Sequence, residues 1–231
     1  MALVSLDRQE RRNAVDQQAC RDLTGAVAEA SDARVLVLTG AGGHFCAGAD
    51  LSQVEDTAFV EALRGALLAL RDAPQPVVAA VDGAALGAGT QLAIACDLRV
   101  ATAEARFGIP AARLGLMVDH WTVQRLALMA GHGPARSMLL AAEVIDGARA
   151  AGLGLVQRLG TLDDALAWAG EIAALAPLTI AGHKLMLNRC ELDIHNDPEV
   201  ADAFARAWRS ADLAEGVAAF KEHRPPTFTG D

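Results

Sequence analysis

Twice in this chain a short apolar run ends in a glycine-rich bend and continues into small residues. The first run, RVLVLTG (34–40), leads into TGAGGHFCAGADL (39–51), and the second, PVVAAVDG (76–83), leads into DGAALGAGTQL (82–92). Short aliphatic and β-branched runs that end in Gly are typical of buried strands. This repetition predicts repeated structural units, each with a strand followed by a glycine-rich turn whose backbone is not covered by large side chains.

Two more strands are predicted at 97–103 and 155–161, and amphipathic helices are predicted between the strands. The helices are 16–30, with Asp16 as its N-cap, 58–71, and 162–176. Strands that alternate with helices indicate the α/β class.

The strand signal ends after Pro177, and residues 178–221 read as helices, with a capped restart at Pro198. We therefore predict two parts, a body over 1–176 and a helical C-terminal region over 177–231.

Composition limits the classes of partner. The 231 residues are 52% hydrophobic and carry a formal net charge of -9, which argues against nucleic acid and anionic membranes. Charges interrupt every apolar stretch before it reaches the length of a membrane span. The four cysteines are scattered without a C-x-x-C pair, which disfavours a metal site or a disulfide framework. We expect a cytoplasmic protein without a metal or cofactor.

The two bends could bind an oxygen atom of a ligand. Backbone N–H groups at the start of a helix lack intrahelical partners, and small side chains leave them accessible. One such bend could hold a phosphate, whereas two that converge could stabilise an oxyanion. Neither matches a P-loop or a dinucleotide-binding fingerprint, and a simple turn after a strand is the alternative for each.

Linked motifs resemble the enoyl-CoA hydratase/isomerase (crotonase) family, in particular actinobacterial members that lack both catalytic glutamates. They are DRQERRNAV (7–15), FCAGADL (45–51), GAALGAGTQLAIACDLRVATAEARFGIP (83–110) and the closing EHRPPTFTG. The resemblance implies a spiral of ββα units followed by a helical region used in trimerisation. It also implies acyl-CoA as ligand or substrate, and a homotrimer or a dimer of trimers.

Site residues follow from the same resemblance. The backbone amides of Ala49 and Ala88 would hold the thioester oxygen. The CoA moiety would lie along seven residues: Arg11, Arg12, Ala47, Ala49, Asp50, Leu51 and Phe220. The acyl pocket would be lined by Gln91, Ala111, Leu114 and Trp121.

The family's two catalytic carboxylates are absent at the matching positions. These positions hold Gln91 and Ala111, neither of which exchanges a proton usefully near neutral pH. General acid–base catalysis contributes ~10²–10⁴-fold per group, so hydration should be nearly lost. The resemblance thus predicts a binder of long or bulky acyl-CoA in fatty-acid metabolism. Such a protein would act as a carrier, sensor or delivery partner, with other fatty-acid-synthesis enzymes as partners.

Alternatives remain open. Asp119 matches the aspartyl nucleophile of the aryl-CoA dehalogenase type, and could support a thioesterase or related hydrolase. Because Asp119 directly precedes the helical stretch WTVQRLALM, it could equally be an N-cap. Trp121 could be an ordinary core residue. A weak enoyl-CoA hydratase and a scaffold with a vestigial pocket complete the set.

Overall fold

A computed structural model describes residues 1–52, 56–189, 205 and 208–227. The chain forms two compact units. The first contains Met1–Phe107 and Ile145–Glu191, and the second contains Gly108–Val144 and Leu192–Asp231. These units divide the chain at points other than the predicted boundary between 176 and 177.

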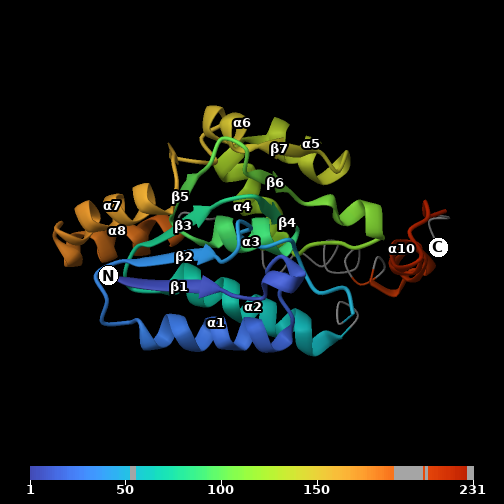
Figure 1. The fold of residues 1–231 in the computed structure, drawn as a ribbon, viewed down its shortest axis with the longest axis horizontal. Coiled ribbons are helices and arrows are strands. Elements are labelled where there is room, and N and C mark those ends of the chain that lie inside the picture. Colours follow the sequence, from blue (N-terminus) through green and yellow to red (C-terminus); the bar gives the residue numbers. More distant parts are fainter. Residues whose placement is uncertain (53–55, 190–204, 206–207, 228–231) are drawn as a thin grey trace. The chain divides into compact units, whose positions relative to one another are not determined.

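The first unit is built on a five-stranded parallel sheet, seen at the centre of Figure 1. The strand order is β1 (Ala2–Leu6), β2 (Leu36–Gly40), β3 (Val77–Val81), β5 (Leu98–Ala101) and β8 (Arg158–Leu159). Each neighbouring pair is parallel. Strands buried on both faces read as continuous apolar runs, which explains why the sequence predicted β2 and β3 correctly.

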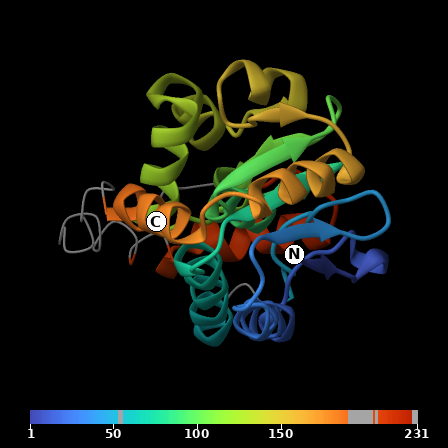
Figure 2. The same ribbon diagram turned by 90° about the vertical axis from the view of Figure 1, so that its left-hand side faces the viewer.

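Helices cover the sheet. α7 (Leu162–Ala173) packs on one face, where it shares a core cluster with the strands. α1 (Gln17–Glu29) and α2 (Thr57–Asp72) pack against each other, as Figures 1 and 2 show. The side chain of Asp16 accepts a hydrogen bond from the Ala19 amide at 2.8 Å, so the predicted N-cap of α1 is confirmed. The core cluster consists of Val35, Val37, Val78, Ala80, Val100, Ala165, Ala169 and Ile172.

A second sheet has the order β4 (Ala84–Leu86), β6 (Arg106–Gly108) and β7 (Val144–Asp146). Three-residue strands are too short to give a periodic pattern, so the sequence did not predict them. Between β4 and β5 lies α3 (Ala88–Ala95), which is buried on every side. α6 (Gly147–Gly152) follows β7.

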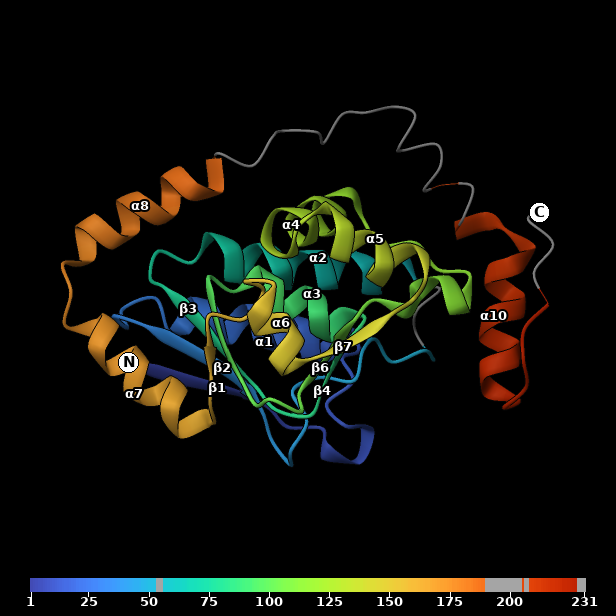
Figure 3. The same cartoon turned by 90° about the horizontal axis from the view of Figure 1, so that it is seen from above.

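The first unit continues beyond residue 176 because α8 (Pro177–Arg189) is anchored to it. The ammonium of Lys184 lies 2.7 Å from a carboxylate oxygen of Asp97 and donates to the backbone carbonyls of Leu70 and Gln75. Figure 3 shows α7 and α8, whose axes are bent by 110°. The helical character expected after Pro177 is confirmed for α8.

The second unit contains the short 3₁₀ helix η2 (Pro110–Leu114), α4 (His120–Ala130), α5 (His132–Leu140) and α10 (Ala211–Lys221). Two glycines allow α10 to approach η2 closely, because a Cβ on Gly216 would overlap the Leu114 carbonyl oxygen. A Cβ on Gly115 would lie 2.5 Å from the carbonyl oxygen of Asp212. The restart predicted at Pro198 falls outside the described residues.

Among the helices that the structure describes, none alone is long and apolar enough for a membrane span. The bent pair α7 and α8 passes that test jointly, by length and composition only.

Candidate functional site: two glycine-rich bends

The structure brings the first bend (39–51) and the second bend (82–92) together. The amide of Cys46 donates to the carbonyl of Ala84 at 2.7 Å, and the amide of Leu86 donates to the carbonyl of Cys46 at 3.0 Å. This is an isolated parallel bridge between Cys46 and Ala85. The two segments, which are distant in sequence, therefore share one short ladder.

Glycines allow the two backbones to approach. A Cβ on Gly89 would overlap the Cys46 carbonyl oxygen, at a separation that real Cβ atoms essentially never show. Gly87 has φ 53° and ψ -116°, a conformation in which a side chain would be strained. Small residues are therefore required here by geometry, and the bare backbone noted in the sequence follows from the contact.

The amide of Ala88 is a donor without an intrahelical acceptor. Ala88 is the first residue of α3, and its N-cap, Gly87, has no side chain to offer. Within the parts of the chain that the structure describes, this amide donates to no protein group. The partial positive charge of a helix N-terminus adds to its affinity for an oxygen that carries negative charge.

The amide of Ala49 is similarly available. Val15 bridges to Ala49 by donating its own amide to Gly48 and accepting from the amide of Asp50. In a parallel bridge of this kind, the N–H of the central residue points away from the partner strand. No acceptor among the described residues takes it.

A buried asparagine attaches the N-terminal loop to the first bend. Asn13 donates its side-chain amide to the carbonyls of Ala41 at 2.8 Å and His44 at 2.6 Å. Its Oδ1 accepts from the amide of Arg8. The carbonyl of Arg12 accepts from the amide of Ala47.

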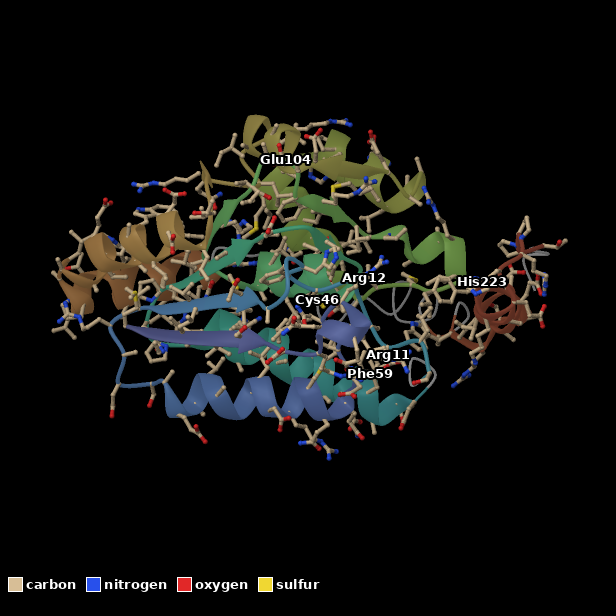
Figure 4. All side chains as sticks on the ribbon, viewed as in Figure 1. Arg11, Arg12, Cys46, Phe59, Glu104 and His223 are labelled. Carbon is tan, nitrogen blue, oxygen red and sulfur yellow. The ribbon has the colours of Figure 1, made fainter. Side chains whose placement is uncertain are left out.

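The same loop carries the two arginines predicted to lie near CoA phosphates. Arg11 and Arg12 are both exposed and flank the end of η1 (Gln9–Arg11). Figure 4 labels them together with Cys46 of the first bend. The Arg12 carbonyl accepts a hydrogen bond from the Ala47 amide, so the backbone of this loop lies beside the first bend. The CoA path along these residues stays a prediction.

Asp50 is committed to protein contacts. Its carboxylate accepts from the hydroxyl and amide of Ser52 and from Arg8, which also pairs with Asp16 at 3.1 Å. Burial alone would raise the pKa of Asp50, but the hydrogen bonds from Ser52 and Arg8 outweigh it, and the pKa is lowered. The carboxylate is therefore a structural anion that ties the first bend to Arg8.

Gln91 belongs to the first unit. It lies on α3, one turn beyond Ala88, and is 6% exposed. The remaining predicted residues belong to the second unit: Ala111 and Leu114 on η2, Trp121 on α4, and Phe220 on α10. Trp121 is buried, with the Arg125 guanidinium 5.6 Å from its ring centroid, whereas Phe220 is 55% exposed.

Asp119 caps a helix. It precedes α4, and its Oδ1 accepts from the amide of Thr122 at 3.2 Å. The N-cap interpretation from the sequence is thus confirmed. A capping carboxylate is held by the helix it starts, which gives Asp119 a structural reason to be present.

Sequence reasoning missed the role of His44. Its Nδ1 accepts a hydrogen bond from the amide of Ala84 at 3.2 Å, so its side chain contacts the second bend. The only signal in the sequence was its place inside the first bend. A lone histidine at such a place does not reveal which group its imidazole will contact.

A family model for enoyl-CoA hydratase/isomerase matches residues 1–231. The chain belongs to the enoyl-CoA hydratase/isomerase family. A probable enoyl-CoA hydratase, echA6, of Mycobacterium tuberculosis is 46% identical over 233 residues, which cover 98% of this chain and 95% of that protein. The mitochondrial enoyl-CoA hydratase domain-containing protein 2 of Bos taurus is 34% identical and covers all of this chain, with 85% of its own length matched.

Solved structures share the fold. The enoyl-CoA hydratase/isomerase of Pseudoalteromonas atlantica has a TM-score of 0.88 at 28% identity, over 98% of this chain and 95% of that one. A methylmalonyl-CoA decarboxylase has a TM-score of 0.91 at 22% identity, over 99% and 95%. The crotonase-type fold predicted from the linked motifs is therefore confirmed. The predicted roles of single site residues stay predictions.

Proposed function

We propose that this family member binds acyl-CoA and holds the thioester carbonyl between the amides of Ala49 and Ala88, without hydrating the acyl chain. The observation that supports this most strongly is the pair of amides, unpaired within the described residues, on two bends that share one ladder. Two fixed donors can stabilise an oxygen that carries developing or partial negative charge, at no cost in reorganisation.

Hydration would need groups that the chain does not offer at the family's positions. Water must be deprotonated and the α-carbon protonated, which two carboxyl groups do in the family's hydratases. Gln91 can orient a ligand by hydrogen bonds but cannot take up a proton usefully near neutral pH. Ala111 offers only a methyl group. The amides of Ala49 and Ala88 would therefore bind the thioester without supporting its hydration.

The test combines calorimetry with an activity assay. Acyl-CoA thioesters of increasing chain length are titrated into the protein, and crotonyl-CoA is then incubated with it while the enoyl absorbance is followed. The proposal expects saturable acyl-CoA binding and an absorbance that stays constant. Turnover near that of an ordinary hydratase would refute it, and a weak hydratase would show slow loss of absorbance. Failure of every acyl-CoA to bind or to raise the melting temperature would indicate a vestigial pocket.

A hydrolase that uses Asp119 is the second candidate. The cap bond to Thr122 occupies Oδ1, and so leaves Oδ2 of the same carboxylate outside that bond. Asp119→Asn separates the two roles because Asn is an equally good N-cap but a poor nucleophile. This candidate expects thioester cleavage by the wild type and none by the Asp119→Asn variant, whose stability should be unchanged. Absence of cleavage in the wild type at every chain length would eliminate it.

We also propose a homotrimer or a dimer of trimers in the cytoplasm, acting with other enzymes of fatty-acid synthesis. Apolar side chains exposed on α8 support an assembly through this helix: Leu178, Leu185, Met186 and Leu187. Several exposed apolar side chains on one helix are typical of a surface that is covered by a partner.

A further inference from the structure

We infer that His44 is a positioning residue that sets the second bend against the first, and so places the amides of Ala49 and Ala88 for one carbonyl oxygen. This rests on the proposed function and deepens it. The inference starts from the hydrogen bond of 3.2 Å between the Ala84 amide and Nδ1 of His44.

The ladder between the bends is irregular at His44. Cys46 pairs regularly with Ala84 and Leu86, but the preceding amide, that of Phe45, donates to Asp82 at 2.8 Å. Regular parallel pairing would bond the Ala84 amide to the carbonyl of His44. That carbonyl instead accepts the side-chain amide of Asn13 at 2.6 Å.

The imidazole of His44 replaces its own carbonyl in the ladder. Without it, the Ala84 amide would lose its acceptor directly beside the pair that joins the bends. An orphaned amide there costs free energy and releases the strand that leads to Gly87 and Ala88. His44 also lies tightly against the turn, since a Cβ on Gly83 would be 2.6 Å from Nδ1.

This geometry fixes the tautomer. A nitrogen that accepts from a backbone N–H carries no proton, so neutral His44 holds its proton on Nε2. Asn is the conservative replacement because its Oδ1 is as many bonds from the backbone as Nδ1. Leu is of similar size and has no acceptor. His132, exposed at the start of α5, provides the matched control.

The experiment measures the affinity ratio between an acyl-CoA thioester and the matching thioether, which lacks the carbonyl oxygen. We expect the wild type, His44→Asn and His132→Leu to share one ratio. We expect His44→Leu to lower it by roughly tenfold, since small misplacements of donors cost that much or more. Affinity for free CoA should stay constant.

Three outcomes would overturn the inference. One is an unchanged ratio in His44→Leu, and another is an Asn variant as poor as the Leu variant. The third needs no variant: nitrogen-15 NMR of the wild-type imidazole showing the proton on Nδ1. A wild type that binds thioester and thioether equally well would instead overturn the proposed function itself, so the two failures are distinguishable.

Discussion

Gly89 sets how closely the two bends approach. The missing side chain makes room for the Cys46 carbonyl, which occupies the space that a Cβ would need. Gly89→Ala should therefore push the bends apart, lower acyl-CoA affinity at least tenfold and destabilise the fold by about 1–3 kcal/mol. Calorimetry and urea denaturation measure the two effects.

The control is Gly25→Ala in α1, where a Cβ would meet nothing within 4 Å. Ala is favoured over Gly in a helix by about 1 kcal/mol, so this variant should be slightly more stable and bind equally well. Equal binding by Gly89→Ala would contradict the role given to the close approach.

The thiols near the bends should be inert. Burial raises the pKa of both Cys20 and Cys46 to about 12 from a reference of 9.0. Because the thiolate is the nucleophile, a disulfide reagent at pH 8 should leave both unmodified in the folded protein. A Cys190→Ser background removes the cysteine that lies outside the described residues. Rapid modification of Cys46 by native protein would contradict this.

The same shift has a consequence for stability. A raised pKa in the folded state gives stability that is complete below about pH 9 and is lost as the pH rises toward 12. Urea denaturation should therefore show a midpoint that falls across this alkaline window.

Among the elements, α8 depends on one buried cation. Lys184 is one of only two lysines in the chain and is 8% exposed. Lys184→Met would break the buried ion pair between the Lys184 ammonium and the Asp97 carboxylate, which should cost about 3 kcal/mol in the free energy of unfolding. Lys221→Met, at an exposed position on α10, is the matched control and should change little. Equal stability of the two variants in urea would show that the ion pair does not anchor α8.

Whether an element could be predicted from the sequence depended on its length and on signals within the element itself, such as an N-cap residue. β2, β3, α1 and α7 were predicted because each has a sustained apolar pattern, and α1 also has a local N-cap signal at Asp16. The cap at Asp119 was also a local feature. β4, β6 and β7 were missed because three residues show no period.

Contacts between residues far apart in the sequence limited how much of the site and of the domain division could be predicted. The His44 bond to Ala84 joins residues 40 apart, and the Lys184 ion pair joins residues 87 apart. No local pattern marks either contact. The bends themselves could be found because close backbone approach requires small residues, which a sequence displays directly.

For the whole molecule, the exposed apolar side chains of α8 predict self-association. Sedimentation should give a mass that is three or six times the 24.0 kDa of one chain. Leu187→Glu places a charge among these exposed apolar side chains and should shift the protein toward smaller species. A wild type that sediments as one chain at micromolar concentration would contradict the assembly.

The claim that the amides of Ala49 and Ala88 hold one thioester oxygen is tested most directly by infrared spectroscopy. The measurement is the C=O stretching frequency of an isotope-labelled thioester in acyl-CoA bound to the protein. Two amides that donate to one oxygen weaken the C=O bond, so we predict a lower frequency in the complex than in water. A fully bound acyl-CoA whose carbonyl frequency stays at its value in water, or rises above it, would contradict the account.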